Sequence, residues 1–243
     1  MNCCANLSNL VIYRALLSDP IVNALRRPKE FFAPELEGLL LVAAEEKGLT
    51  GIIPLEYLLS AIVHEQNVFS AVAEKKGKWI GIAPFAKHQG KIYPVDQMEK
   101  VVEELSRKED VTIFLFGGKG FEEAILSKWA YEYPEVISVV GKYRLDQELA
   151  LISQLDLLIC MDSANMHFAS VVGTKVLSVW GATHPYAGFY GYHQHADNVI
   201  QLDLSCRPCS VFGEKPCFRG DMACLKQISP KVIIDKVEAI LYS

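Results

Sequence analysis

The feature that most constrains the fold is a regular alternation of short apolar runs with amphipathic stretches of helical periodicity, beginning near residue 78. This alternation is typical of βαβ units, in which right-handed helical crossovers connect parallel strands. The expected strands are residues 79–85, 111–116, 137–140, 157–161, 175–180 and 199–202. The expected helices are residues 94–106, 121–133 and 146–155, one helix from Ser163 and a last one from Pro230. We therefore expect an α/β fold with a Rossmann-like, nearly all-parallel sheet.

The first 76 residues carry a different pattern. Apolar residues recur there at helical spacing in two stretches, from Leu36 to Ala43 and from Leu55 to Val63, with Gly48 and Gly51 between them. Such spacing predicts a helical hairpin and not a βαβ unit. We therefore divide the chain into a small helical segment, residues 1–76, and a Rossmann-like domain, residues 77–243.

Composition excludes several classes of protein. The chain has 243 residues, of which 51% are hydrophobic, so it can bury a large core. Its net charge of −5 argues against a nucleic-acid partner. No apolar run approaches the roughly 20 residues that a membrane-spanning helix needs, and the start lacks the features of a signal peptide. We expect a soluble, cytoplasmic protein with at most a peripheral contact with a membrane.

The expected strand 157–161 runs directly into a helix that begins with small and polar residues. Asp162, Ser163 and Ala164 form this junction, and His167 lies one helical turn further on. Backbone N–H groups and the helix dipole at such a junction hold anionic ligands, phosphates above all. A second interpretation stays open, because Asp and Ser are also favoured as helix caps and a lone histidine in a helix is often structural.

Three further residues follow the other expected strands. Thr183 lies in Gly181-Ala182-Thr183-His184-Pro185 and can donate its hydroxyl to a phosphate, or cap a turn. Lys91 lies in a basic loop after the first strand, where it can reach a diphosphate or remain solvated. Glu122 follows a glycine-rich turn and can accept hydrogen bonds from ribose hydroxyls, or favour the N-terminus of a helix.

Four of the seven cysteines cluster near the C-terminus, at Cys206, Cys209, Cys217 and Cys224. The Cys-x-x-Cys spacing of the first two lets two thiolates share one ion, which is typical of half a zinc site. The second pair has no standard zinc spacing. The cluster therefore predicts either a structural zinc or a set of free or redox-labile thiols.

Taken in their order along the chain, these residues resemble the C-terminal donor domain of the ADP-heptose:lipopolysaccharide heptosyltransferases, glycosyltransferase family 9. The family signature is Asp-Ser/Thr-Gly-x-x-His-x-Ala, then a Gly-Thr turn, then a strand ending in Gly-Pro/Ala-Thr-x-Pro. In this chain the signature reads Asp162-Ser163-Ala164-Asn165-Met166-His167-Phe168-Ala169, Gly173-Thr174 and Gly181-Ala182-Thr183-His184-Pro185. The resemblance extends from about Trp79 to the last helix and includes the cysteine-rich segment.

The resemblance implies the C-terminal half of a GT-B fold and an inverting, metal-independent glycosyltransferase that needs no cofactor. Its donor would be an ADP-sugar, ADP-heptose, and its acceptor the lipopolysaccharide core, at the inner face of the inner membrane. Lys91, in Lys91-Ile92-Tyr93-Pro94, matches the lysine that contacts the donor phosphates, and Glu122 matches the acidic residue near the ribose. The residues that match the diphosphate site are Asp162, Ser163 and Ala164, with His167 nearby and Thr183 beside it.

Two departures from the family pattern limit this expectation. Ala164 stands where the family has glycine, and its Cβ narrows the approach of a phosphate to the backbone. Residues 1–76 show no match to the family's N-terminal Rossmann domain with its general-base aspartate; Glu56, His64 and Glu65 are present, but no motif supports them. The sequence therefore leaves the general base unidentified. It leaves open a heptosyltransferase, a catalytically silent nucleotide-binding or interaction module, and one half of a split enzyme.

Overall fold

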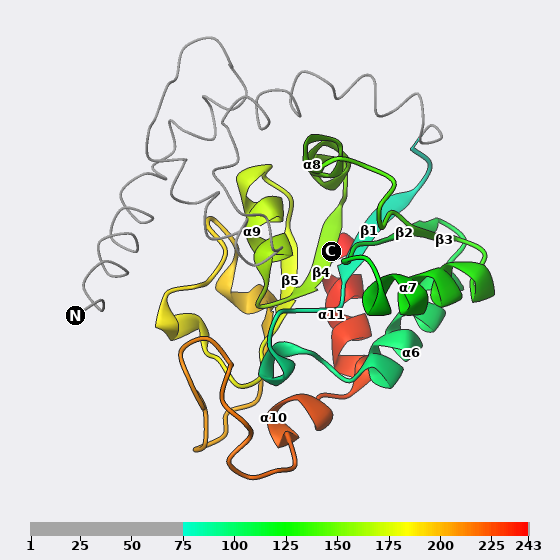
Figure 1. Ribbon diagram of the computed structural model, residues 1–243. Helices are drawn as coiled ribbons and strands as arrows, with labels where there is room; N and C mark the ends of the chain where they lie inside the picture. Colours follow the sequence, from blue (N-terminus) through cyan, green and yellow to red (C-terminus); the bar gives the residue numbers. More distant parts are fainter. Residues whose placement is uncertain (1–74, 243) are drawn as a thin grey trace, which may run out of the picture.

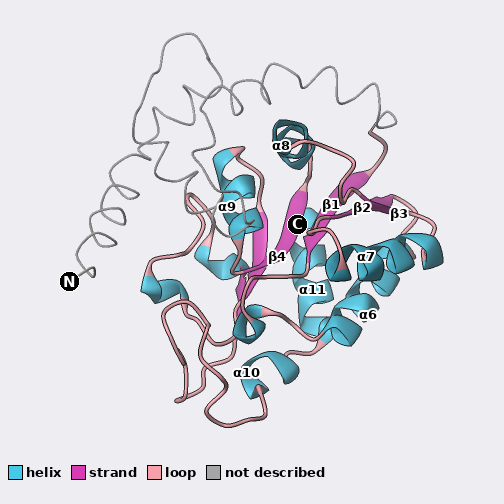
Figure 2. Ribbon diagram, in the orientation of Figure 1, coloured by secondary structure: helices cyan, strands magenta, loops and turns pink. Residues whose placement is uncertain are grey.

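The computed structural model describes residues 75–242, which form a parallel β-sheet with helices on both faces (Figures 1 and 2). The helical segment expected at residues 1–76 lies almost entirely outside the described residues, so that expectation stays a prediction. Within the described part, the six strands are β1 (Lys78–Ala83), β2 (Val111–Leu115), β3 (Val136–Ser138), β4 (Leu157–Met161), β5 (Val176–Val179) and β6 (Val199–Ile200).

The sheet has the strand order β3-β2-β1-β4-β5-β6, and every neighbouring pair is parallel. The expected Rossmann-like sheet is therefore confirmed, with all its strands parallel. The edge strands β3 and β6 are shorter than the apolar runs that predicted them. A strand at an edge has one neighbour to pair with, and only three residue pairs join β3 to β2 and two join β6 to β5.

Six α-helices accompany these strands in the described part of the chain: α6 (Val95–Ser106), α7 (Phe121–Glu132), α8 (Leu145–Ser153), α9 (Ala164–Val171), α10 (Ala223–Lys226) and α11 (Pro230–Leu241). The long helices lie where the periodicity places them. In α6 the expected face of Met98, Val101, Val102 and Leu105 is completely buried. The short helix α10 had no sequence prediction, because one turn shows no periodicity.

Two hydrophobic layers hold the helices to the sheet. Side chains alternate along β1, so Ile80 and Ile82 face one layer and Trp79 and Ala83 face the other. The first layer contains the buried faces of α6, α7 and α11, and the second contains those of α8 and α9. Figure 1 shows these two groups of helices on opposite sides of the sheet.

The order in which successive strands are added to the sheet reverses between β1 and β4, which lie side by side at the centre of the sheet. The helix after β1, α6, packs on one face, and the helix after β4, α9, packs on the other. The loops that follow these two strands therefore lead to helices on opposite faces of the sheet. Doubly wound sheets bind ligands at this topological switch point.

No helix among residues 75–242 is both long enough and apolar enough to span a membrane.

Candidate functional site

A buried ion pair lies at the switch point. Asp162 comes directly after β4, and Lys91 lies in a short 3-10 helix, Gln89–Lys91, in the loop after β1. Lys91 Nζ lies 3.1 Å from Asp162 Oδ2, and the two side chains are only 7% and 3% exposed. The loop after β1 therefore directs a cation to the carboxyl end of β4, which answers the question that the sequence left open for Lys91: it is not a solvated surface lysine.

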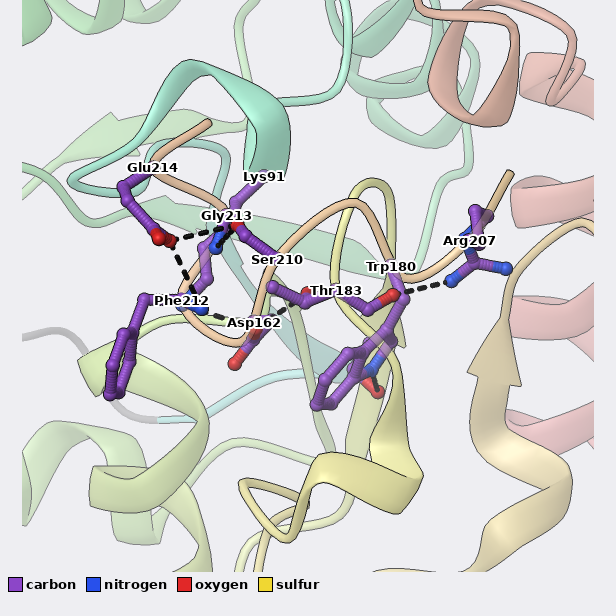
Figure 3. Close-up of polar contacts among 10 residues, drawn as sticks. Lys91, Asp162, Trp180, Thr183, Arg207, Ser210, Phe212, Gly213 and Glu214 are labelled. Atoms are coloured by element: carbon purple, nitrogen blue, oxygen red, sulfur yellow. Dashed lines mark hydrogen bonds and ion pairs between the residues drawn. The ribbon is translucent and has the colours of Figure 1, made fainter. Parts of the chain in front are cut away.

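Thr183 completes this group from the loop after β5. Its Oγ1 donates a hydrogen bond of 2.8 Å to Asp162 Oδ2, and the residue is fully buried (Figure 3). The structure thus brings together Lys91, Asp162 and Thr183, three of the predicted site residues, from the ends of three strands. Because the single proton of the Thr183 hydroxyl goes to Asp162, Thr183 orients the carboxylate that holds the lysine.

Close backbone contact joins the loops that carry Lys91 and Thr183. The Ala182 N–H donates a 2.8 Å hydrogen bond to the Gly90 carbonyl. A Cβ on Gly181 would lie 2.4 Å from that same carbonyl oxygen, so only glycine permits this approach. The glycine before Lys91 and the glycine before Ala182 are therefore part of the geometry of the site.

The N-terminus of α9 lies beside the ion pair and carries polar atoms without a partner. Ser163 is the N-cap of α9, as the sequence predicts, but its side chain makes no capping hydrogen bond. Within residues 75–242, the buried Ser163 Oγ and Asn165 Oδ1 have no hydrogen-bond partner. Buried polar groups are normally paired, so the two atoms mark a place for a polar ligand. Ala164, the first residue of α9, is 4% exposed.

His167 lies one turn into α9, near enough to Asp162 and Lys91 to interact with both charges. Burial lowers the pKa of His167 to about 4, with a smaller contribution in the same direction from Lys91, whereas Asp162 opposes the shift. The imidazole is therefore neutral at pH 7. In that state it can form hydrogen bonds but supplies no positive charge to a phosphate.

Glu122 has a structural contact in the described part of the chain. It lies in the first turn of α7, and its Oε2 accepts a 2.6 Å hydrogen bond from the Gly118 N–H. This bond closes the glycine-rich turn after β2. None of its hydrogen bonds among residues 75–242 goes to Lys91, Asp162 or Thr183, so contact with a ribose stays a prediction.

The four clustered cysteines are free thiols in the structure. Among the described residues, no three His, Cys, Asp or Glu side chains are arranged to hold a metal ion. As placed, Cys206, Cys209, Cys217 and Cys224 do not form a zinc site, and the structural zinc stays a prediction.

One residue of the cysteine-rich segment was not identified from the sequence. Arg207 donates hydrogen bonds to the backbone carbonyls of Gly181 and Thr183, in the loop that completes the site. These two acceptors are backbone atoms more than 20 positions away in the chain, and backbone contacts leave no mark in the residue types. No motif could have found it.

A known protein family matches most of the described domain. The model of glycosyltransferase family 9 (heptosyltransferase) matches residues 53–216, more than half of the chain. The chain belongs to glycosyltransferase family 9. The resemblance described from the signature residues is thereby confirmed, and the ion pair, Thr183 and the N-terminus of α9 all lie inside the matched region.

Two curated heptosyltransferases are similar in sequence. The chain is 27% identical to lipooligosaccharide heptosyltransferase 2 of Campylobacter jejuni over 173 residues, 68% of this chain and 52% of that protein. It is 30% identical to lipopolysaccharide heptosyltransferase 3 of Escherichia coli over 130 residues, 52% of this chain and 36% of that protein. The chain thus spans about half the length, or less, of these curated relatives.

Solved structures show the same fold. The ADP-heptose lipopolysaccharide heptosyltransferase II of E. coli superposes with a TM-score of 0.58 at 18% identity, covering 74% of this chain and 51% of that one. A family 9 glycosyltransferase of Veillonella parvula gives a TM-score of 0.58 at 19% identity, covering 74% and 50%. The described domain therefore has the Rossmann-like α/β architecture of GT-B glycosyltransferases, as expected.

Proposed function

We propose that residues 75–242 bind the donor of a heptosyltransferase that transfers a sugar from a nucleoside diphosphate, ADP-heptose, to the lipopolysaccharide core. The observation that carries this proposal is the buried Lys91–Asp162 pair beside the unpartnered Ser163 Oγ at the N-terminus of α9. A cation and free backbone N–H groups at one strand end form a site for a dianion. Membership of family 9 supports the choice of donor and acceptor.

Each residue of the group would have a distinct role in donor binding. Lys91 would donate further hydrogen bonds from its ammonium to the diphosphate, and the N–H groups at the start of α9 would bind other diphosphate oxygens. Asp162 and Thr183 would keep the lysine ammonium in place through the contacts at 3.1 and 2.8 Å. His167 is neutral at pH 7 and would act only through hydrogen bonds.

The same contacts would assist the chemistry. In the proposed inverting reaction, an acceptor hydroxyl attacks the anomeric carbon, the bond from that carbon to the diphosphate breaks, and a general base takes the hydroxyl proton. Negative charge then develops on the leaving diphosphate, where Lys91 and the dipole of α9 would stabilise it without a required metal. The general base is not identified, and Glu56, His64 and Glu65 lie outside the described residues.

The proposal also places the protein in the cytoplasm, with peripheral contact with the inner face of the inner membrane. Family membership supports this location, since ADP-heptose and the growing core would have to meet the same enzyme.

Ala164 favours a second candidate, a catalytically silent module that binds nucleotides. Its methyl group stands at the start of α9, where the family signature has glycine, and it is buried. A Cβ at this position restricts how closely a phosphate can approach the backbone. The silent module would retain donor binding at reduced affinity and would lack transfer.

Two measurements test the proposal. Isothermal titration calorimetry with ADP, AMP and adenosine should give the tightest binding for ADP, because the second phosphate is the group that meets Lys91. An assay with ADP-heptose and a deacylated core acceptor should then show transfer. Binding without transfer would favour the silent module, and no preference for ADP over adenosine would contradict the donor site itself.

A further inference from the structure

Arg207 lies outside the proposed donor site and is hydrogen-bonded to the loop of residues 181–183, which completes that site. Its guanidinium donates a 2.8 Å hydrogen bond to the Thr183 carbonyl (Figure 3). It donates another to the Gly181 carbonyl. It also donates to the Leu202 carbonyl and, at 3.1 Å, to Gln201 Oε1, both just after β6. One side chain thus ties the loop after β5 to the segment that follows the edge strand.

These bonds leave the loop of residues 181–183 little freedom. Ala182 lies between the two residues whose carbonyls bind Arg207. The Ala182 N–H donates a hydrogen bond to the Gly90 carbonyl, and the Ala182 carbonyl accepts a 2.7 Å hydrogen bond from the Cys209 N–H. The Thr183 side chain projects from the end of this restrained loop to Asp162. Its hydroxyl can meet Asp162 Oδ2 at 2.8 Å only while the loop keeps this position.

The positively charged guanidinium of Arg207 is surrounded by neutral hydrogen-bond acceptors. Among residues 75–242 no carboxylate lies within ion-pair distance of the half-buried guanidinium, and all the hydrogen bonds found for it go to neutral oxygens. Burial lowers the pKa of Arg207, although the group remains charged. Its planar array of donors suits several carbonyls at fixed angles, which a lysine ammonium cannot reproduce.

The same segment reaches the site again at its other end. Ser210 donates a 2.8 Å hydrogen bond to Glu214, and the Gly213 N–H donates to Ser210 Oγ, so residues 210–214 form a closed turn. A Cβ on Gly213 would lie 2.9 Å from Lys91 Cγ and 3.3 Å from Thr183 Cγ2. The segment 207–214 therefore lies close to both the lysine and the threonine of the group.

We propose that Arg207 is a positioning residue of the donor site, holding the 181–183 loop so that Thr183 keeps Asp162 against the Lys91 ammonium. The inference rests on the proposed donor site. It gives part of the cysteine-rich segment a role: the stretch between Cys206 and Cys217 acts through the backbone of a neighbouring loop and without contact with the donor.

The test is a double-mutant cycle read out as ADP affinity. The full chain would be prepared as wild type, Arg207→Gln, Thr183→Val and the double variant, with Arg219→Gln as the matched control. Arg219 lies on the same cysteine-rich segment but is exposed and pairs with Asp221. Calorimetry gives the dissociation constant of ADP for each, and urea unfolding gives their stabilities separately.

If Arg207 acts through Thr183, Arg207→Gln should weaken ADP binding by about tenfold, the effect of losing a charged hydrogen bond. In the Thr183→Val background the same change should weaken it by less than about threefold, since coupled residues are not additive. Arg219→Gln should bind ADP as the wild type does. Where Arg207→Gln does not fold, Arg207→Lys serves in the same cycle, because a lysine keeps the charge but cannot reach both carbonyls.

Unchanged ADP affinity in the Arg207 variant, or full additivity with Thr183→Val, would overturn the inference while leaving the donor site intact. A loss of stability without any loss of ADP affinity would show a role in folding alone and would overturn it as well. A wild-type protein that binds no ADP would overturn the proposed function and this inference with it.

Discussion

Lys91 and Asp162 illustrate how far a single residue pair can indicate function. Moving two charges out of water costs several kcal/mol for each ion, and their attraction repays this cost only with good geometry and further hydrogen bonds. Here the contact is 3.1 Å, and Thr183 supplies one such bond. A buried ion pair is weak evidence for stability, but at a strand end on a switch point, where doubly wound sheets bind ligands, it indicates a binding site.

Variants of Lys91 and Asp162 distinguish the effect of the ion pair on the free energy of unfolding from its effect on ADP affinity. In Lys91→Met, Asp162 is left as a buried, uncompensated charge, and the free energy of unfolding should fall by about 3–5 kcal/mol. In Lys91→Met/Asp162→Asn that charge is removed, so stability should recover whereas ADP affinity should stay at least about tenfold below wild type. Urea unfolding and calorimetry measure the two effects. The matched control is Lys87→Met, an exposed lysine of the same loop, which should change neither.

The lowered pKa of His167 predicts that the stability of the protein depends on pH. Its folded-state pKa of about 4 lies below its ordinary value of 6.5, so between these values the unfolded chain binds more protons. The contribution of His167 is therefore complete above about pH 6.5 and is lost as the pH falls towards 4. At ~1.4 kcal/mol per pH unit below about pH 6.5, the full effect between pH 7 and 5 is about 2 kcal/mol. Because the imidazole is partly exposed, solvent screening should reduce the loss to about 1 kcal/mol.

Urea unfolding of wild type and His167→Gln at the two pH values measures this loss. The variant should lose about 1 kcal/mol less than wild type between pH 7 and 5. Equal losses in the two proteins would contradict a lowered pKa of His167 in the folded state.

At the scale of elements, the site is an assembly of loops on a regular sheet. The segments that meet at the carboxyl edge follow β1, β4 and β5, and the segment after β6 packs over two of them. Loops carry function because a rigid scaffold positions them, and here the scaffold is the centre of the sheet. Their mutual hydrogen bonds fix positions that the strands alone would not.

A pair of glycines tests how the segment 207–214 contacts the site. Gly213 and Gly220 both have φ +77°, so alanine at either position costs about 1–2 kcal/mol of backbone strain. Only at Gly213 would the new Cβ meet Lys91, at 2.9 Å from Cγ, whereas nothing lies within 4 Å of a Cβ at Gly220. Gly213→Ala should therefore weaken ADP binding, measured by calorimetry, and Gly220→Ala should not. Equal affinities in the two variants would argue against a restraint on Lys91.

Most elements of the described domain were predictable, for a local reason. Each buried strand from β1 to β5 is an apolar run, and α6, α7, α8 and α11 show the spacing of one buried helical face. The predictions differ at element ends, as for α8, which ends at Ser153 although the buried Leu155 continues its apolar pattern. Where a helix or strand ends depends on its neighbours in space.

For the whole molecule, donor binding should appear as added stability. A ligand that binds only the folded state adds about 2.7 kcal/mol when its concentration is 100 times its dissociation constant. For a protein of this size that corresponds to a rise in Tm of roughly 5–10 °C. Differential scanning fluorimetry with ADP should show this rise, whereas adenosine at the same concentration should show little, because it lacks the phosphates that Lys91 would bind in the proposed site. Equal shifts with the two ligands would contradict a diphosphate site.

By itself, the sequence determined the class of the fold, the order of its main elements, the family and the strand ends on which Lys91, Asp162, Ser163 and Thr183 stand. These follow from periodicity and from a signature whose residues are close in the chain. Only the tertiary structure decided that Lys91 is buried against Asp162, that Thr183 donates to that carboxylate, that Glu122 binds its own turn, and that Arg207 holds the loop. Those contacts, the local one of Glu122 aside, join residues far apart in the chain, and all depend on backbone positions, which residue types alone do not specify.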